Sequence, residues 1–197
     1  ASCGDSAFLH PISKATQSTA GIMQSMTETV FSIDTIPKSY APNEVEAGII
    51  AKWNDASIGQ CDASASGKPF SILIPPPNVT APLHLGHALN NTLQDVLIRW
   101  HRMRGDSTLW MPGTDHAGIA TQTVVEKRLL QQEDKKRTDF TREEFVSRVK
   151  SWKDEYETTI LGQLKAIGAS CDWERTRFTM DDMCASAVRE AFFQLYK

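Results

Sequence analysis

The spacing of apolar residues changes several times along the chain, and each change marks an expected element. A nearly continuous apolar run, Phe70–Ile74, lies between a Gly-Lys-Pro turn and three consecutive prolines. A short apolar run with such boundaries is typical of a strand that is buried on both faces, as in a parallel sheet. The run Ser107–Met111 predicts a second strand.

Helical periodicity surrounds these strands. It predicts a short helix over 44–53, a longer one from about 83–85 to Gly105, and a third over 119–131. On the second helix, residues three and four apart form an apolar stripe that we expect to face the core. The stripe consists of Leu89, Leu93, Val96, Trp100 and Met103. The order strand, helix, strand, helix predicts a βαβ unit with a parallel sheet and a right-handed crossover.

The last third of the chain predicts two more helices. Thr141 and Glu144 form a capping box at the start of a helix that ends at Gly168. Its expected inward face consists of Phe145, Val149, Trp152, Tyr156, Ile160, Leu164 and Ile167. Thr179 is predicted to cap the last helix, with Met183, Ala187, Ala191 and Leu195 directed inward.

Residues 1–37 differ from the rest of the chain. They hold six Ser, five Thr and only four charged residues, without sustained periodicity. This composition predicts a disordered arm. A hydroxyl-rich leader is also compatible with a transit-peptide remnant, although this one lacks Arg and contains three acidic residues. The expected organisation is therefore an arm over 1–37 and a folded domain over 38–197.

Composition and charge narrow the class of protein. The chain has 197 residues, is 41% hydrophobic and carries a net charge of −3, as in ordinary soluble globular proteins. It has no long uncharged apolar run that would predict a membrane-spanning helix. The four cysteines form no C-x-x-C pair, which favours reduced thiols over a zinc ribbon or a disulfide scaffold. The net charge gives no global sign of a nucleic-acid partner, but residues 99–154 carry a net charge of +3 and leave that partner open.

The candidate chemistry lies between Pro75 and His87, where the first strand leads into the second helix. In parallel sheets, ligands bind at the carboxyl ends of strands, and a helix N-terminus offers free N–H groups to phosphate. This turn contains neither a G-x-G-x-x-G fingerprint nor a Walker lysine. Instead, His84 and His87 share one face of the first helical turn and can donate to phosphate oxygens. A zinc pair and plain surface histidines are the alternatives.

These residues resemble a known family. His84-Leu-Gly-His87 resembles the HIGH motif of class I aminoacyl-tRNA synthetases. Residues 40–197 as a whole resemble the valyl-tRNA synthetase family within that class. The resemblance is carried mainly by PPPNVT at 75–80, LHLGHAL at 83–89, LWMPGTDHAGIATQ at 109–122 and GASCDWERTRFTMD at 168–181.

The resemblance implies an α/β fold, the first half of a Rossmann-like parallel-sheet catalytic domain that binds a nucleotide, preceded by a short helix and the arm. It implies a ligase that activates valine with ATP to valyl-adenylate and transfers the valyl group to tRNA(Val). Mg²⁺ would accompany ATP, and no metal would be bound by the protein itself. The full-length enzyme would be monomeric and not bound to a membrane. It would be cytoplasmic, or alternatively mitochondrial or plastid.

Matching positions give the expected site. His84 and His87 would be catalytic and would stabilise the phosphates, and Asp115 would be the counter-charge for the ammonium group of valine. The expected ATP-binding residues are Asn78, Thr80, His84, Gly86 and His87, and the expected valine-binding residues are Pro76 and Asp115. Trp110 and His116 would flank the site, with Trp110 more typical of a core residue.

The sequence also departs from the family. Ala81 stands where relatives usually have Gly, which would cause strain if that position needs a positive φ. No K-M-S-K-S loop, editing domain or anticodon-binding segment is present. We therefore expect an amino-terminal fragment, truncated before the editing insertion and inactive alone. A non-catalytic nucleotide-binding module and a metal-dependent hydrolase using His84, His87 and His116 remain alternatives.

Overall fold

The computed structural model describes residues 38–197, so the predicted arm over 1–37 lies outside the described residues. The described residues belong to two units, whose boundary lies between Ala47 and Gly48. Helix α2 (Pro42–Asp55) begins in the first unit and includes the short helix expected over 44–53. All the elements below belong to the second unit.

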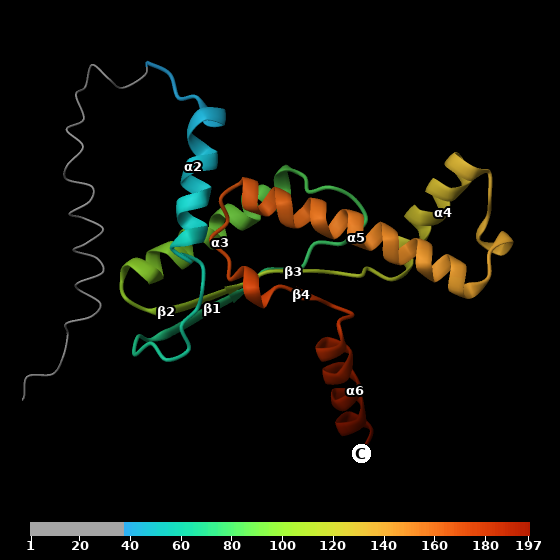
Figure 1. The fold of residues 1–197 in the computed structure, drawn as a ribbon. Coiled ribbons are helices and arrows are strands. Elements are labelled where there is room, and N and C mark those ends of the chain that lie inside the picture. The colour runs from blue at the N-terminus through green and yellow to red at the C-terminus, as the bar shows by residue number, and fades with distance from the viewer. Residues whose placement is uncertain (1–37) are drawn as a thin grey trace, which may run out of the picture. The chain divides into compact units, whose positions relative to one another are not determined.

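Two parallel strands form the centre of this unit. β1 (Pro69–Leu73) pairs with β2 (Ser107–Met111) in parallel, with Phe70 opposite Thr108. Helix α3 (Leu85–Met103) connects the two strands, which confirms the predicted βαβ unit. A second parallel pair joins β3 (Gly113–Thr114) to β4 (Arg177–Phe178). In Figure 1 the β3–β4 pair lies beyond the end of the β1–β2 pair.

Three further helices and two 3₁₀ turns complete the unit. Their bounds are α4 (Ile119–Glu133), η2 (Arg137–Asp139), α5 (Arg142–Ala166), η3 (Trp173–Arg175) and α6 (Asp182–Tyr196). The predicted capping box of α5 is confirmed: the Thr141 side chain accepts from Glu144 N at 3.2 Å, and the Glu144 carboxylate accepts from Thr141 N at 2.8 Å. Satisfying these otherwise unpaired donors fixes the start of the longest helix.

The buried apolar residues form two clusters that meet at α5. The main cluster contains Ile74, Val79, Ile98, Trp110, Ile160, Leu164, Ala169 and Cys171. The second contains Val125, Leu129, Phe145 and Trp152 and joins α4 to α5. The predicted inward face of α5 is confirmed except at Ile167, which is exposed. Trp110 is fully buried, as expected for a core residue.

The prediction for the apolar stripe of α3 is wrong. All five of its residues are exposed, from 50% for Trp100 to 87% for Met103, while Asn91 and Ile98 are the buried residues of this helix. The reason is that the inward face carries polar groups with partners. Gln94 accepts from the indole of Trp110 at 3.1 Å, and Asp95 accepts from the Ser170 hydroxyl at 2.6 Å. The periodicity of apolar residues gives no information about such hydrogen bonds.

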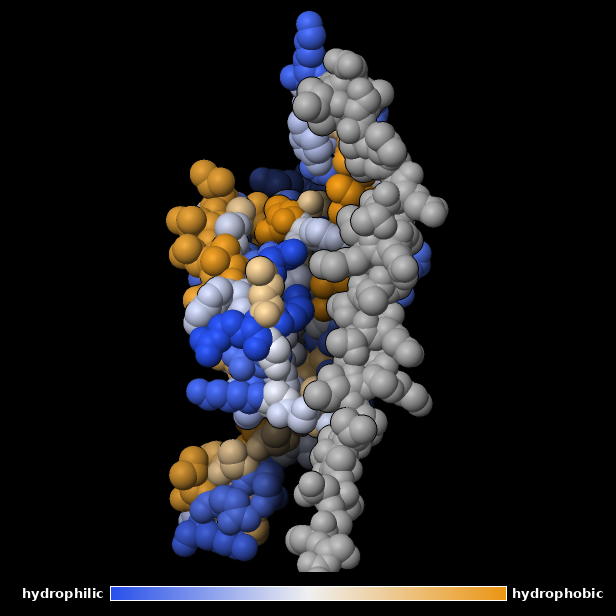
Figure 2. Space-filling view, turned by 90° about the vertical axis from the view of Figure 1, so that its left-hand side faces the viewer, coloured by the Kyte–Doolittle hydropathy of each residue, from blue (hydrophilic) through white to orange (hydrophobic). Residues whose placement is uncertain are grey.

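Two further burial predictions need correction. Strand β1 is not buried on both faces: its residues alternate in exposure, and Leu73 is 67% exposed. The reason is that, among the described helices, α3 makes the most extensive contacts with this strand pair, and the outward residues of β1 stay uncovered. None of the residues of α6 is buried, so Met183, Ala187, Ala191 and Leu195 are not directed into a core. Figure 2 shows hydrophobic residues on the surface of α6, at the lower end of the view.

The prediction that Thr179 caps α6 is also wrong. The N-cap is Asp181, whose carboxylate accepts from Cys184 N at 2.8 Å. A carboxylate at this position also interacts favourably with the helix dipole. The hydroxyl of Thr179 is used by a different part of the chain, described below.

Two properties of the described residues bear on the wider predictions. Cys61, Cys171 and Cys184 are free thiols, and Cys3 lies outside the described part. None of the helices between residues 38 and 197 combines the length and apolar character needed to cross a bilayer.

Candidate functional site

The two histidines close the N-terminus of α3. His84 is the N-cap residue, and its Nδ1 accepts from Gly86 N at 3.0 Å. His87 reaches back, so that its Nδ1 accepts from His84 N at 3.2 Å. The two rings lie 4.0 Å apart, centroid to centroid. This is a capping box in which imidazoles replace the usual hydroxyl and carboxylate.

The capping bonds decide which ring nitrogen carries the proton. An Nδ1 atom that accepts a backbone N–H has no proton of its own, so the neutral ring is protonated at Nε2. In the neutral form both histidines are therefore Nε2–H donors. Two such donors beside a helix N-terminus are suited to bind phosphate oxygens without either ring being charged.

The fold also explains the glycine between the two histidines. A Cβ at Gly86 would lie 2.9 Å from Cε1 and 3.0 Å from Nδ1 of His84. The His84 ring therefore occupies the space that any side chain at position 86 would need. Gly86 thus lets the N-cap histidine fold over its own helix.

We expect the histidine cap to weaken in acid. Burial and the adjacent His84 lower the pKa of His87, so the unfolded chain binds a proton on this ring at higher pH than the folded chain. Stability from this group is complete above the ordinary pKa of histidine, and it is lost as the pH falls from there through the lowered pKa of the folded chain. Urea midpoints of wild type and His87→Asn, measured between about pH 7.5 and 5.5, test this. The wild type should lose more stability than the variant, and equal losses would contradict the role of His87.

The loop that leads from β1 to α3 is fixed at three points. Val79 is fully buried, its N donates to Asp115 O at 3.0 Å, and its O accepts from the buried Trp152 indole at 2.8 Å. Further along, Leu83 N donates to the Gln163 side chain at 2.8 Å. Around these anchors Pro76 and Asn78 are exposed and Thr80 is half-buried. The expected ligand-binding residues of this loop are thus accessible on a rigid backbone.

The expected strain at Ala81 is absent. The non-glycine residues with positive φ in the described part are Ser57, Ala117 and Asp134. The backbone at Ala81 therefore does not need glycine. The unusual conformation lies instead after β3, where Ala117 (φ 50°) and Gly118 (φ 45°) lead into α4.

Asp115 lies beside this loop. A parallel β-bridge pairs Asn78 with Asp115, and Asp115 N donates to Pro77 O at 2.8 Å. The carboxylate is one-third exposed and accepts through Oδ1 from Ala117 N at 3.1 Å and from the Thr179 hydroxyl at 2.9 Å. The structure therefore brings together the loop expected to bind the nucleotide and the expected ammonium-binding carboxylate. Their contact runs through backbone atoms.

Sequence reasoning missed one residue of this cluster. Thr179 contacts both Asp115 and His116, although it is distant in sequence. Its position within the RFTMD motif was the only signal that could have drawn attention to it.

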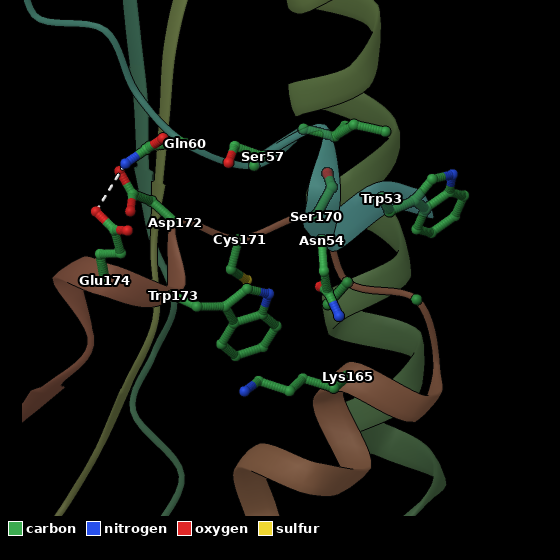
Figure 3. A pocket seen from close by; sticks show the side chains of 14 residues that line it. Trp53, Asn54, Ser57, Gln60, Lys165, Ser170, Cys171, Asp172, Trp173 and Glu174 are labelled. Carbon is green, nitrogen blue, oxygen red and sulfur yellow. Dashed lines mark hydrogen bonds between the residues drawn. The ribbon is translucent and has the colours of Figure 1, made fainter. Parts of the chain in front are cut away.

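A cavity of the second unit lies elsewhere. It has a volume of about 210 Å³, and none of the expected site residues lines it. Figure 3 shows it between the loop after α2, the end of α5 and the segment that contains Asp172. Asp172 is buried there, and its Oδ2 accepts from Cys61 N at 3.0 Å and from Arg175. These bonds tie the loop after α2 to the segment that follows α5.

The three histidines of the hydrolase alternative have different contacts in the structure. No group of three or more His, Cys, Asp or Glu side chains in residues 38–197 is placed to hold a metal ion. His116 forms its contacts with Asp115 and Thr179, whereas the His87 ring accepts from His84 N and the His84 ring accepts from Gly86 N. The hydrolase alternative would need all three histidines on one ion, an arrangement that these contacts do not form.

Comparisons with known proteins agree with the sequence resemblance. A family model described as tRNA synthetases class I (I, L, M and V) matches residues 48–197. The chain is 58% identical over 161 residues to a valine–tRNA ligase of Rhodopirellula baltica, covering 82% of the chain and 16% of the relative. It is 52% identical over 163 residues to one of Chlamydia muridarum, covering 83% and 17%. The chain thus spans less than a fifth of the length of these relatives.

A solved structure shows the same fold. A LeuRS of Agrobacterium radiobacter, crystallised as a ternary complex with tRNA and LeuAMS, matches with a TM-score of 0.65. Its sequence identity is 23%, and the match covers 80% of this chain and 18% of that one. At this identity the similarity concerns the fold alone.

Proposed function

The chain belongs to the class I tRNA synthetases of the I, L, M and V group, and from that premise we propose that it is the amino-terminal part of a valine–tRNA ligase. The longer protein would activate valine with ATP and transfer the valyl group to tRNA(Val). The chain spans less than a fifth of its relatives, so this activity is proposed for the whole protein.

One observation carries the proposal. The histidine cap of α3 follows β1, Asp115 follows the neighbouring β2–β3 segment, and a backbone bridge joins the two loops. The cap offers N–H donors to the phosphates of ATP, while the Asp115 carboxylate offers a counter-charge to an ammonium group. With ATP bound at the cap and valine bound at Asp115, the carboxylate of valine would face the α-phosphate of ATP.

The reaction needs little else from these residues. The valine carboxylate oxygen would attack the α-phosphorus in line, the bond to the bridging oxygen would break, and pyrophosphate would leave. Both reactants are anions, so catalysis depends on positioning and on donors that stabilise charge in the transition state. The Nε2–H groups of His84 and His87 are such donors. Mg²⁺ would arrive with ATP, since it commonly binds through phosphates and water.

Amino-acid-dependent exchange of pyrophosphate into ATP tests the proposal. The full-length protein that carries this chain should catalyse exchange with valine far better than with leucine or methionine. Isoleucine should be a weak substrate, because a pocket for valine excludes it by size. No exchange with any amino acid would favour the non-catalytic nucleotide-binding alternative. Preference for another amino acid would contradict the valine assignment.

Gly86→Ala should separate folding from activity. Alanine normally stabilises a helix by about 0.5–1 kcal/mol relative to glycine. At position 86 it must displace the His84 ring, so the variant should fold but lose exchange activity by about tenfold or more, through loss of a positioned donor. The matched control is Gly162→Ala in α5, where a new Cβ has no neighbour within 4 Å. It should gain stability, measured by urea unfolding, and keep full activity. Equal activity in both variants would contradict the role of His84.

A further inference from the structure

The hydroxyl of Thr179 lies at the centre of three polar groups from one loop. Its Oγ1 is 3.0 Å from His116 N, 2.6 Å from His116 Nδ1 and 2.9 Å from Asp115 Oδ1. The loop and Thr179 are 63 residues or more apart in sequence. A hydroxyl in such a position can organise a site only if its single proton and two lone pairs suffice for all three neighbours.

They suffice in one arrangement. The His116 amide can only donate, so it uses one lone pair of Thr179. The Asp115 carboxylate can only accept, so it takes the hydroxyl proton. The remaining lone pair then accepts from His116 Nδ1, which must be protonated. All three contacts are satisfied together when His116 carries its proton on Nδ1, the opposite of the two capping histidines.

The backbone holds this hydroxyl in place. Thr179 N donates to Thr114 O at 3.1 Å, directly after the β3–β4 pairing, and Arg177 N donates to Pro112 O at 3.1 Å. Thr179 is therefore attached by backbone bonds to the strand that leads into Asp115. The distance between its hydroxyl and the carboxylate is set by strand pairing.

The consequence concerns the free side of the carboxylate. Both hydrogen bonds to the Asp115 side chain, from the Thr179 hydroxyl and from Ala117 N, reach Oδ1. No residue between 38 and 197 forms a hydrogen bond with Oδ2, and the side chain is one-third exposed. One oxygen is thus fixed by two donors while the other is available to a ligand.

We propose that Thr179 is a positioning residue that orients Asp115 to bind the ammonium group of the amino acid. This inference rests on the proposed function and adds to it a residue outside the loops already assigned. Thr179 does not touch the substrate. It acts by holding Oδ1 and the His116 ring, so that Oδ2 faces the ligand in a single orientation.

Thr179→Val tests the inference in the full-length protein, because valine keeps the shape and removes the hydroxyl. The expected result is a 10- to 100-fold higher KM for valine in pyrophosphate exchange. A change of about this size corresponds to the loss of one hydrogen bond to a charged group. The KM for ATP should change by less than about threefold, because the histidine cap is untouched. Thr179→Ser should restore the KM for valine. The matched control is Thr158→Val, whose hydroxyl bonds only to Asp154 O in its own helix.

The outcomes are distinct. A wild type without valine-dependent exchange overturns the proposed function and this inference with it. An active wild type, with an unchanged KM for valine in Thr179→Val, overturns the inference alone. Equal increases for valine and ATP also overturn it, since they would indicate general damage. If Thr179→Val does not fold, Thr179→Ala replaces it. Faster amide hydrogen exchange over residues 112–120 in the folded variant would support the geometry without an activity assay.

Discussion

Replacing His87 with alanine should lower valine-dependent pyrophosphate exchange by about 100- to 1,000-fold in the full-length protein, the usual effect of removing one donor to transition-state charge. The variant loses the Nε2–H of His87 and also the acceptor for His84 N. The N-cap residue would then lose a restraint on its own backbone. Both members of the histidine pair are therefore affected by a single substitution.

The control for this result lies on the same helical turn. Leu85 is 86% exposed, and Leu85→Ala removes a side chain of comparable size next to the cap. It should keep exchange within about threefold of wild type, as expected for a surface substitution. An active His87→Ala variant, or equal losses in both variants, would show that the cap does not take part in the chemistry.

Replacing Ile160 with alanine should lower the free energy of unfolding of the chain by about 2–5 kcal/mol, the usual range for truncating a fully buried aliphatic residue. Ile160 is 0% exposed and belongs to the main core, where α5 packs beside β2 and α3. The truncation leaves a cavity among residues held by two strands and two helices, which limits relaxation. Urea unfolding of the 197-residue chain, followed by far-UV circular dichroism, measures the loss.

Leu93→Ala is the matched test of the outward face of α3. Leu93 belongs to the apolar stripe that periodicity assigned to the core, but it is 59% exposed. Its truncation should cost less than about 1 kcal/mol in the same chain. A cost equal to that of Ile160→Ala would show that the stripe is buried and that the orientation of α3 described above is wrong.

The sequence predicted best those features that depend on neighbours along the chain. The alternation of strands and helices, the capping box at Thr141 and the placement of His84 and His87 on a first turn all follow from local spacing. Local rules apply there because the partners lie three or four residues apart. The inward face of α5 was predictable for the same reason, since its apolar residues coincide with its buried ones.

The failures share a physical cause. The inward face of α3 is polar because Gln94 and Asp95 bond to Trp110 and Ser170, which are 16 and 75 residues away. Thr179 was interpreted as a cap because hydroxyl residues favour that position, yet its partners lie more than 60 residues upstream. Hydrogen bonds between distant segments override both periodicity and capping preference, and one sequence without tertiary information does not reveal them. The roles assigned to Pro76, Asn78, Thr80 and Asp115 stay predictions that the proposed assays address.

The polar inner face of α3 also affects the orientation of the two histidines at its N-terminus. A helix held by apolar packing can roll about its axis by several degrees with little penalty, because dispersion contacts are not directional. A helix held by bonds from Trp110 to Gln94, from Ser170 to Asp95 and from Arg99 to Gly168 O cannot, since hydrogen bonds weaken steeply as they bend. The rotation of α3 about its own axis is thus fixed by hydrogen bonds. Because His84 and His87 lie at the first turn of α3, the fixed rotation of the helix also fixes the direction in which their rings point.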